Sequence, residues 1–369
     1  MNVLSKNILL FITVLFLSQA QASNFSGVSY FDFSYVDKQG GVFDMTRTHL
    51  KYANKLSHNI DYNVVLDVER ESDDSSLSVY LSNAELRMQL FVEASISLGL
   101  IKMNMFDAQE ETWGHRYISK SAMELYNFSA SDDFGVGFYY RLGNLNFSAL
   151  LTNGEGYNSS GIDEFQRYSF QFLYGKSNLK SISKGSAFNA GLALSIENFE
   201  SLVPRSGVVI DNLEEYNSPT VQDLFSGTRI VTGLFGGFTN ESIMAGFEYN
   251  MFNMLDSEYT TIDQGDNVPF GDDELAGVYS TYGQMKTSTI ISTYLSLGVT
   301  PKLNTFFRLD MYDPNIAVDA NTDSQTHILI GVQFALTNRI NVAPLIKQNI
   351  LESSDAGTTD LMVNFEFSF

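Results

Sequence analysis

The chain has 369 residues, of which 43 are acidic and 22 are basic, so its formal net charge is −21 at pH 7. Proteins that bind nucleic acid need a positively charged surface, and this composition therefore argues against a nucleic-acid partner. The chain contains no cysteine, which excludes a disulfide framework and thiol chemistry.

The first residues have the pattern of a secretory signal peptide. Lys6 supplies the positive charge, Ile8–Leu17 is apolar but too short to span a bilayer, and Ala20-Gln21-Ala22 is typical of a cleavage site. The alternative interpretation of this stretch is a membrane anchor. We expect residues 1–22 to be removed on export, and residues 23–369 to form one domain.

Apolar and polar residues alternate along the rest of the chain. In Ile60–Arg70, for example, the apolar Tyr62 and Val64 are separated by the polar Asn63, as in a strand with one apolar face. Each such segment has roughly the ten residues that a tilted strand needs to cross a membrane. About sixteen segments have this pattern: Asn24–Val36, Phe43–Ala53, Ile60–Arg70, Leu77–Phe91, Ala94–Met103, Phe134–Leu142, Leu145–Asn153, Phe165–Gly175, Ser186–Glu197, Thr228–Phe238, Ser242–Phe252, Thr287–Val299, Leu303–Asp313, Gln325–Thr337, Ile340–Leu351 and Thr359–Phe369.

The last segment shows the alternation most clearly. One of its faces is entirely apolar and consists of Leu361, Val363, Phe365, Phe367 and Phe369. An open sheet edge with such a face would invite aggregation in water. The pattern therefore favours an all-β fold, a transmembrane antiparallel β-barrel of about 16 strands with apolar side chains toward lipid and polar ones toward the interior.

The connections between the predicted strands differ in length in a regular way. Every second connection is short, as in Val92–Glu93, Gly143–Asn144 and Asn338–Arg339, and only Lys176–Gly185 in this set is longer. The others include long ones such as Asn198–Gly227 and Asn253–Lys286. Short turns on one rim and long loops on the other are typical of bacterial outer-membrane barrels. A secreted β-sandwich, such as a lectin or adhesin, is the alternative fold, because period-two alternation also occurs there.

The connection Asn104–Asp133 is long and rich in both aromatic and charged residues. It contains Trp113, the only tryptophan, together with apolar residues such as Tyr117 and Phe128 that need a surface to pack against. We expect this loop, the third outer one, to fold into the interior and to constrict a pore; the alternative is an outer lid packed on neighbouring loops. Its charged and titratable residues are Asp107, Glu110, Glu111, His115, Arg116, Lys120 and Glu124.

Charged residues also lie on the predicted inner face of the strands. The basic ones are Arg47, Lys51, Arg87, Arg141, Arg308 and Lys347, and the acidic ones include Asp61, Asp67, Glu69, Glu85 and Asp310. Basic wall residues opposite an acidic loop would produce a field across the pore that orients dipolar solutes. The alternative is that each inward arginine pairs with an acid on the next strand.

Several short motifs resemble those of the phosphate-selective porin O/P-like outer-membrane porins. They are WGHRYISK at 113–120, SDDFGVG at 131–137, NGEGY at 153–157, RLDMYDP at 308–314 and QTHILIGVQFALTNRIN at 325–341. The resemblance implies a sixteen-stranded, trimeric porin of the Gram-negative outer membrane with an inward third loop. Anion-selective members depend on clustered Arg and Lys, whereas this loop is acidic, so we expect weak cation preference; anion or phosphate selectivity is the alternative.

Catalysis is not indicated. None of the four histidines, His49, His58, His115 and His327, lies in a recognisable motif with a serine nucleophile. Calcium on the acidic stretch Asp263–Glu274 is an alternative, but this stretch lacks the EF-hand spacing. We therefore expect no enzyme activity, metal or cofactor, and we expect outer-membrane lipid, lipopolysaccharide, small hydrophilic solutes and further copies of the chain as partners.

Overall fold

The computed structural model describes residues 24–36, 40–70, 76–154, 156–157, 165–182, 184–204, 222–255, 260–261, 278–279, 285–316, 324–352 and 357–369. The predicted signal peptide and the acidic stretch Asp263–Glu274 lie outside these residues.

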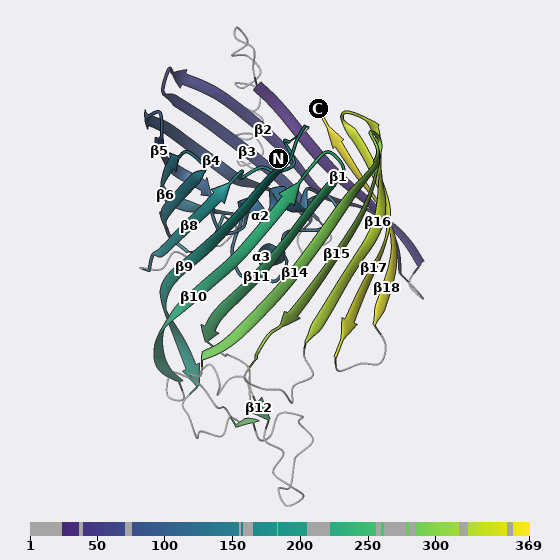
Figure 1. Ribbon diagram of the computed structural model, residues 1–369. Helices are drawn as coiled ribbons and strands as arrows, with labels where there is room; N and C mark the ends of the chain where they lie inside the picture. The colour runs from purple at the N-terminus through teal and green to yellow at the C-terminus, as the bar shows by residue number, and fades with distance from the viewer. Residues whose placement is uncertain are drawn as a thin grey trace, which may run out of the picture.

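Sixteen antiparallel strands close into a barrel (Figure 1), in which each strand pairs with its two sequence neighbours around the ring. They are β1 (Asn24–Val36), β2 (Gly40–Ser57), β3 (Ile60–Arg70), β4 (Leu77–Phe91), β5 (Ala94–Lys102), β6 (Asp132–Leu142), β7 (Leu145–Thr152), β8 (Arg167–Gly175), β9 (Ala187–Pro204), β10 (Gln222–Thr239), β11 (Ile243–Leu255), β14 (Met285–Thr300), β15 (Leu303–Asp313), β16 (Gln325–Thr337), β17 (Ile340–Leu351) and β18 (Thr358–Ser368). The prediction of a sixteen-stranded all-β barrel is therefore confirmed.

The first and last strands join the ends of the sheet. Phe31 of β1 lies opposite Phe365 of β18, and the pairing continues along both strands. At the end of the chain, the Phe369 N–H donates to the Gly27 carbonyl at 3.0 Å. Closure leaves neither of these strands with an unpaired edge, which removes the aggregation hazard that an apolar edge strand would present.

Three features differ from the sequence prediction. β2, β9 and β10 continue beyond the predicted Phe43–Ala53, Ser186–Glu197 and Thr228–Phe238; in β10, for example, Gln222 still pairs with Pro204 of β9. Two short helices, α2 (Asp107–Trp113) and α3 (Ala122–Leu125), lie between β5 and β6. A separate two-stranded ladder joins β12 (Thr260–Thr261) to β13 (Val278–Tyr279).

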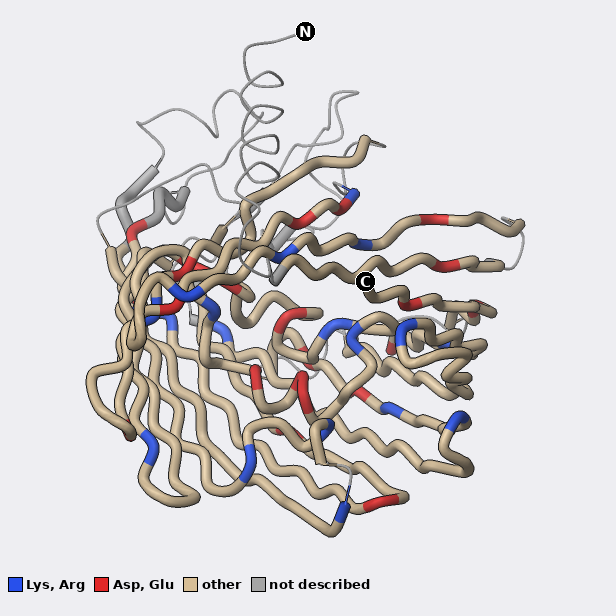
Figure 2. Tube along the Cα trace, turned by 90° about the horizontal axis from the view of Figure 1, so that it is seen from above, with Lys and Arg blue, Asp and Glu red and all other residues tan. Residues whose placement is uncertain are grey.

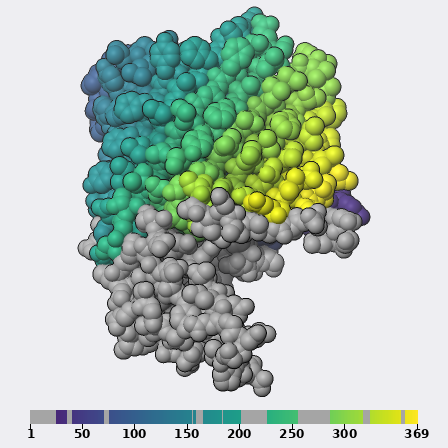
Figure 3. Space-filling model, turned by 60° about the horizontal axis from the view of Figure 1, so that its bottom comes forward, coloured from purple at the N-terminus to yellow at the C-terminus, as the bar shows by residue number. Residues whose placement is uncertain are grey.

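The two faces of the sheet have opposite polarity. Large apolar side chains on the outside are exposed, among them Leu98, Leu192 and Ile330, and the outer surface of the strands is continuous in Figure 3. The alternate positions are polar and buried, as for Asp67 and Ser97. A β-sandwich buries its apolar faces and exposes its polar ones, so this arrangement contradicts the sandwich alternative.

Seen from above, the paired strands surround an interior (Figure 2). One end of the barrel carries the short turns, such as the one at Gly143, whose φ of +60° suits glycine. We call this end, where Gly27 meets Phe369, the short-turn end, and the opposite end the long-loop end. Residues 103–131, which connect β5 and β6, are called the β5–β6 segment below.

Candidate functional site

The β5–β6 segment folds into two short helices separated by turns. α2 ends at Gly114, which has a φ of +70° and donates its N–H to the Glu110 carbonyl at 2.9 Å. Glycine is favoured at this left-handed C-cap position. A side chain at position 114 would also collide with Met244, because a Cβ built there would lie 2.7 Å from its Cε.

Apolar side chains of the segment pack against the strands. The Trp113 side chain is only 1% exposed, and its ring lies edge-on to Tyr294 of β14 and Phe306 of β15, at centroid distances of 5.8 and 6.2 Å. A second cluster joins Met123 and Phe128 of the segment to side chains of β9, β10 and β14. Burial of several large side chains supplies most of the free energy that holds such a segment in place.

Polar side chains of the barrel also hold the backbone of the segment. They come from β8, β14, β15, β18 and the turn after β8, and each donates to a backbone carbonyl. The pairs are Gln171 to Asn104 (2.6 Å), Tyr294 to Gln109 (3.2 Å), Arg308 to Lys120 (2.6 Å), Asn364 to Tyr117 (3.1 Å) and Lys180 to Gly114 (2.9 Å). Carbonyls that would otherwise be buried without a partner are thereby satisfied.

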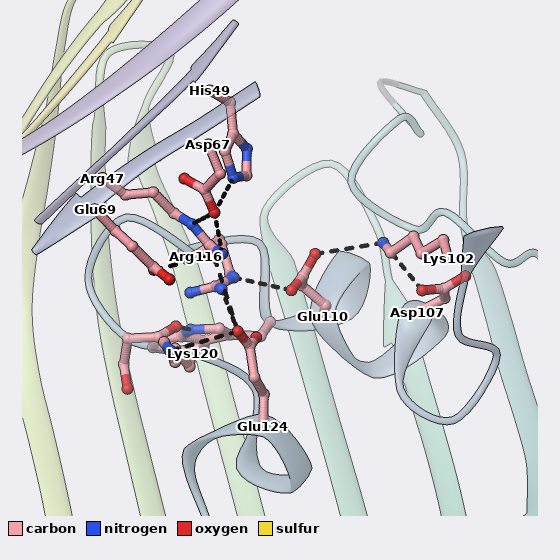
Figure 4. A network of polar contacts seen from close by, with 12 residues as sticks. Arg47, His49, Asp67, Glu69, Lys102, Asp107, Glu110, Arg116, Lys120 and Glu124 are labelled. Atoms are coloured by element: carbon pink, nitrogen blue, oxygen red, sulfur yellow. Dashed lines mark hydrogen bonds and ion pairs between the residues drawn. The ribbon is translucent and has the colours of Figure 1, made fainter. Parts of the chain in front are cut away.

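Ion pairs connect the two helices of the segment (Figure 4). Arg116 lies between Glu110 of α2 and Glu124 of α3, with nitrogen–oxygen distances of 3.0 and 2.7 Å. Lys120 approaches the same Glu124 oxygen at 3.6 Å. Arg116 and Glu124 are both less than one-fifth exposed, so water and salt screen this contact less than a surface pair.

The same chain of ion pairs reaches the barrel wall at both ends. At one end, Arg47 of β2 lies 3.7 Å from Glu124 and donates to Asp67 of β3 at 2.7 Å. At the other, Lys102 of β5 pairs with Asp107 at 3.0 Å and with Glu110 at 3.6 Å. Charged groups thus extend from β2 and β3 across the segment to β5, as Figure 4 shows.

The surroundings of two segment residues change their proton affinity. Burial of the Glu110 carboxyl would by itself raise its pKa, but the neighbouring Lys102 and Arg116 outweigh burial and lower that pKa below its ordinary value. Burial lowers the pKa of the His115 imidazole to about 3, so this ring is uncharged at neutral pH. Glu110 therefore contributes a fixed negative charge, whereas His115 contributes none.

Two cavities are lined in part by residues of this ion-pair chain. One cavity of about 470 Å³ is lined by β1–β5 and the segment, and its charged or titratable lining residues are Arg47, His49, Lys51, Glu85, Lys102, Glu110, Arg116 and Asp132. We call it the β1–β5 cavity. A second cavity, of about 380 Å³, lies toward the long-loop end and is lined by Lys120, Glu124, Tyr157, Arg167, Glu197 and Arg229, among others.

The structure brings together several of the residues predicted from the sequence. Arg47, Asp67 and Glu69 meet in one cluster with the segment residues Arg116 and Glu124. Lys51 lines the β1–β5 cavity with an exposed side chain. Glu111 has no ion-pair partner among the described residues, although its neighbour Glu110 has two.

Other predicted wall residues lie apart from this cluster. Glu85 pairs with Arg87 at 3.0 Å, and the Arg87 guanidinium lies over the Tyr139 ring. Asp61 is exposed near the short-turn end, where Lys55 approaches it at 3.9 Å. Arg141, beside the turn after β6, is also exposed, whereas Lys347 lines a third cavity near β16–β18.

Arg308 and Asp310 differ from the expectation of an open, solute-contacting wall. Both are fully buried, at 1% and 0% exposure, and they pair with each other at 2.8 Å. Arg308 also lies over the Trp113 ring, 5.2 Å from its centre, and donates to Lys120. The β5–β6 segment covers this pair, which therefore anchors the segment and has no access to a solute.

Some residues of the site were not singled out from the sequence. Lys102 ends β5 and pairs with α2, while Arg167 and Arg229 both pair with Glu197, at 2.6 and 3.3 Å. Tyr157 accepts from Arg47 at 3.3 Å and donates to Glu69 at 3.2 Å. Strict alternation would place Lys102 on the outer face with Leu98 and Leu100, so the local pattern gave no signal for it. Tyr157 lies in a loop, where the alternation also gives no signal.

One serine–histidine contact bears on the question of catalysis. His115 Nε2 lies 2.7 Å from Ser296 Oγ, but His115 Nδ1 is buried without a hydrogen-bond partner, and no carboxylate of the described residues orients the ring. A nucleophilic triad needs such an orienting group. Among the described residues, no group of three or more His, Asp or Glu side chains is placed to hold a metal ion, and none of the described helices is long and apolar enough to cross a membrane.

No protein-family model matches the chain, and no curated protein matches it. Solved structures do resemble it. Pseudomonas putida OprB, in a structure at high pH, has 8% identity over 97% of this chain and 96% of its own, with a TM-score of 0.63. An anion-selective porin from Comamonas acidovorans has 11% identity over 94% and 99% of the two chains, with a TM-score of 0.60.

A third resemblance is to OmpT of Vibrio cholerae, an outer-membrane protein, at 11% identity over 95% and 99% of the two chains and a TM-score of 0.57. The chain has the fold of these outer-membrane barrels. Sequence identity this low supports a shared fold and nothing more. The resemblance to the phosphate-selective porin O/P-like family therefore stays a prediction from the sequence motifs.

Proposed function

We propose that the protein is a porin, a passive, water-filled channel for small hydrophilic solutes and ions in the outer membrane of a Gram-negative bacterium. One observation carries the proposal: a closed barrel whose outer face is apolar and whose inner face is polar and charged. Such a barrel is stable where lipid surrounds it and water fills it, because every backbone group is paired and no apolar face meets water.

The β5–β6 segment is the constriction of this channel. Its hydrophobic contacts with β14 and β15 and its hydrogen bonds from β8, β15 and β18 support a location inside the barrel. Its ion pairs with Arg47 of β2 and Lys102 of β5, together with the packing of Trp113 on Tyr294 of β14 across the ring, support a location between opposite parts of the wall. The passage then follows the β1–β5 cavity, and solutes pass beside Arg47, Lys51 and Glu110.

Weak cation preference is the selectivity we propose. The chain carries a formal charge of −21, and a protein of strongly negative charge concentrates cations at its mouth. An anion-selective channel is the second candidate, because the β1–β5 cavity is lined by four permanently cationic side chains, those of Arg47, Lys51, Lys102 and Arg116, against the carboxyl groups of Glu85, Glu110 and Asp132. The sign of the reversal potential under a salt gradient decides between them.

We further propose a homotrimer that contacts lipid and lipopolysaccharide through the apolar outer face, without a catalytic role or a bound cofactor. The barrel would reach the outer membrane after cleavage of residues 1–22. One OmpT structure among the similar solved structures is described as a trimer. For this chain, cross-linking of the detergent-purified protein tests the oligomeric state.

Swelling of liposomes tests the proposed function. Vesicles that contain the purified protein should swell in isosmotic solutions of small sugars and amino acids, at rates that fall with solute size. Vesicles with heat-denatured protein serve as the control. Equal swelling rates with and without the native protein would contradict a passive channel.

A further inference from the structure

A third cavity lies at the long-loop ends of β16, β17 and β18, beside the end of α3. Its volume is about 460 Å³, within the range of roughly 300–1,000 Å³ that is usual for small-molecule sites. The β5–β6 segment contributes Leu125 and Tyr126 to its lining, and the wall contributes His327, Lys347 and Asn349. We call it the β16–β18 cavity.

His327 lines this cavity and has an unsatisfied acceptor beneath its surface. Its side chain is 7% exposed, and its Nδ1 contacts the Asn349 Oδ1. Because an amide oxygen only accepts, Nδ1 carries the proton, and Nε2 of the neutral ring is then an acceptor. Nε2 is buried and has no hydrogen-bond partner. Such a group costs free energy unless a ligand or water donates to it.

An aromatic ring and hydrogen-bonding groups complete the lining. Tyr126 stacks on Tyr312 of β15, with ring centres 4.3 Å apart and planes 23° from parallel. Tyr312 therefore holds the Tyr126 ring in a fixed orientation. Lys347 offers ammonium donors, and the Asn349 amide contacts Thr358 at 3.4 Å. Among the described residues that line the cavity, none is a carboxylate and none is an arginine.

We propose that the β16–β18 cavity binds a ring of an uncharged, hydroxyl-rich solute, that is, a carbohydrate, before it passes the β5–β6 segment. A sugar hydroxyl donates to His327 Nε2, another accepts from Lys347, and the apolar face of the ring packs on Tyr126. The inference rests on the proposed channel function. A phosphorylated solute fits less well, since tight recognition of phosphate uses arginine forks and several charges.

The chemistry of the lining excludes other ligand classes. A divalent cation is usually held by several oxygen ligands that include carboxylates, whereas the described lining offers no carboxylate and contains the cationic Lys347. A wholly apolar ligand would leave His327 Nε2 and the Lys347 ammonium desolvated without partners, which is unfavourable. A neutral polyol ring satisfies both groups and still covers the tyrosine.

Isothermal titration of the full-length, detergent-purified protein with maltose tests this inference. A polyethylene glycol of similar mass, which is uncharged and has few hydroxyls, serves as the ligand control. We expect saturable binding of maltose and none of the glycol. His327→Phe, which removes the acceptor at similar size, should weaken maltose binding at least about tenfold, a change of about 1.4 kcal/mol.

Two further variants keep the test decisive. Tyr126→Leu keeps an apolar side chain in the segment but removes the flat ring, and it should also weaken maltose binding about tenfold. His49→Phe changes the β1–β5 cavity instead and should leave maltose binding unchanged. A correctly folded His327→Phe or Tyr126→Leu protein that binds maltose as well as the wild type would overturn the site.

Failure of the site and failure of the channel are distinguishable. Titration measures binding and does not require conduction, whereas liposome swelling measures conduction and does not require binding. Swelling without saturable maltose binding would overturn this inference and leave the channel in place. Saturable, His327-dependent maltose binding by a protein that does not conduct would overturn the proposed channel and leave the binding site in place.

Discussion

Arg47 of β2 and Glu124 of α3 approach each other to 3.7 Å, although each has a closer partner elsewhere. Arg47 donates to Asp67 at 2.7 Å, and Glu124 accepts from Arg116 at 2.7 Å. The wall and the β5–β6 segment are thus each paired internally, and the contact between them is the loosest of the three. Most charges along the passage are therefore already paired with an opposite charge. A substitution that neutralises one of them should change the reversal potential in a way that depends on which partner it leaves behind.

Glu110→Gln should shift the reversal potential toward anions. The carboxylate lines the β1–β5 cavity and pairs with both Lys102 and Arg116. Its neutralisation removes one negative charge and so frees part of their positive charge beside the passage, although Lys102 keeps Asp107 and Arg116 keeps Glu124 as a partner. The measurement is the zero-current potential of the channel under a KCl gradient. The shift should shrink as ionic strength rises, because screening shortens the reach of the freed charges.

Glu111→Gln is the matched control for this substitution. It removes the same charge from the neighbouring residue, but Glu111 does not line the β1–β5 cavity and has no ion-pair partner among the described residues. We expect a clearly smaller shift than for Glu110→Gln. Equal shifts for the two variants would show that the passage does not follow the β1–β5 cavity.

Arg308→Met should loosen the β5–β6 segment. The substitution leaves the buried Asp310 carboxylate without its ion-pair partner, with the Ser292 hydroxyl still donating to it, and leaves the Lys120 carbonyl without its donor. Breaking a buried ion pair costs about 3–5 kcal/mol. The loss should appear as a lower urea midpoint of unfolding and as increased quenching of Trp113 fluorescence by acrylamide.

A double variant provides the internal check. Arg308→Met combined with Asp310→Leu removes both charges and should recover part of the stability, since replacement of a whole buried pair by apolar groups is often nearly neutral. If the double variant proved less stable than Arg308→Met, the uncompensated Asp310 carboxylate would not be the cause of the loss.

Trp113→Ala should destabilise the segment and make the channel current noisier. The side chain is 1% exposed and packs on Tyr294 and Phe306, and removal of such a group costs about 3–5 kcal/mol. Trp113→Phe, which keeps an aromatic ring, should be milder. Chemical unfolding and the open-channel current noise measure the two effects, and identical noise in the wild type and Trp113→Ala would contradict packing of the segment beside the passage.

Acidification should unpack the segment through His115. The His115 imidazole has a pKa of about 3 in the folded protein, against about 6.5 when exposed. The unpacked state therefore binds more protons between these values, and stability falls as pH decreases from about 6.5 to about 3. Glu110 acts in the same direction below about pH 4, because its folded pKa lies below the ordinary one. Burial raises the pKa of the Asp107 and Glu111 carboxyls, so these two groups act in the opposite direction.

Acrylamide quenching of Trp113 as a function of pH measures this effect, because Trp113 is the only tryptophan of the chain. Quenching should increase on acidification in the wild type and much less in His115→Gln. His58→Gln, in an exposed turn, is the control. A pH dependence unchanged in His115→Gln would place its origin at another group.

The strands could be predicted from the sequence because period-two alternation is a local property. Ile60–Arg70 and Leu303–Asp313 agree with the structure at both ends. The predicted start of β10 is too late, because Gly227 interrupts the apolar alternation there. In the structure Gly227 nevertheless pairs with Phe199 of β9, and β10 begins at Gln222. Pairing with a neighbouring strand decided that boundary, and the local pattern carried no information about it.

The charged site was harder to predict for a tertiary reason. Arg47 and Arg308 both occupy polar positions of strands. Arg47 lines the β1–β5 cavity, whereas Arg308 lies under Trp113 and Lys120. Which wall residue the segment covers depends on contacts far apart in the sequence. For the same reason, the pairing of Arg116 with Glu110 and Glu124 follows from the turn between α2 and α3, and the residue types alone do not specify it.

Single-channel conductance in planar bilayers tests the central claim most directly, in the wild type and in a variant that lacks residues 109–122. We predict discrete, ohmic steps for the wild type and larger steps for the deletion variant, because the deletion removes most of α2 and the turn that follows it. Absence of steps for both proteins would contradict the channel. Equal steps would contradict a constriction by the β5–β6 segment.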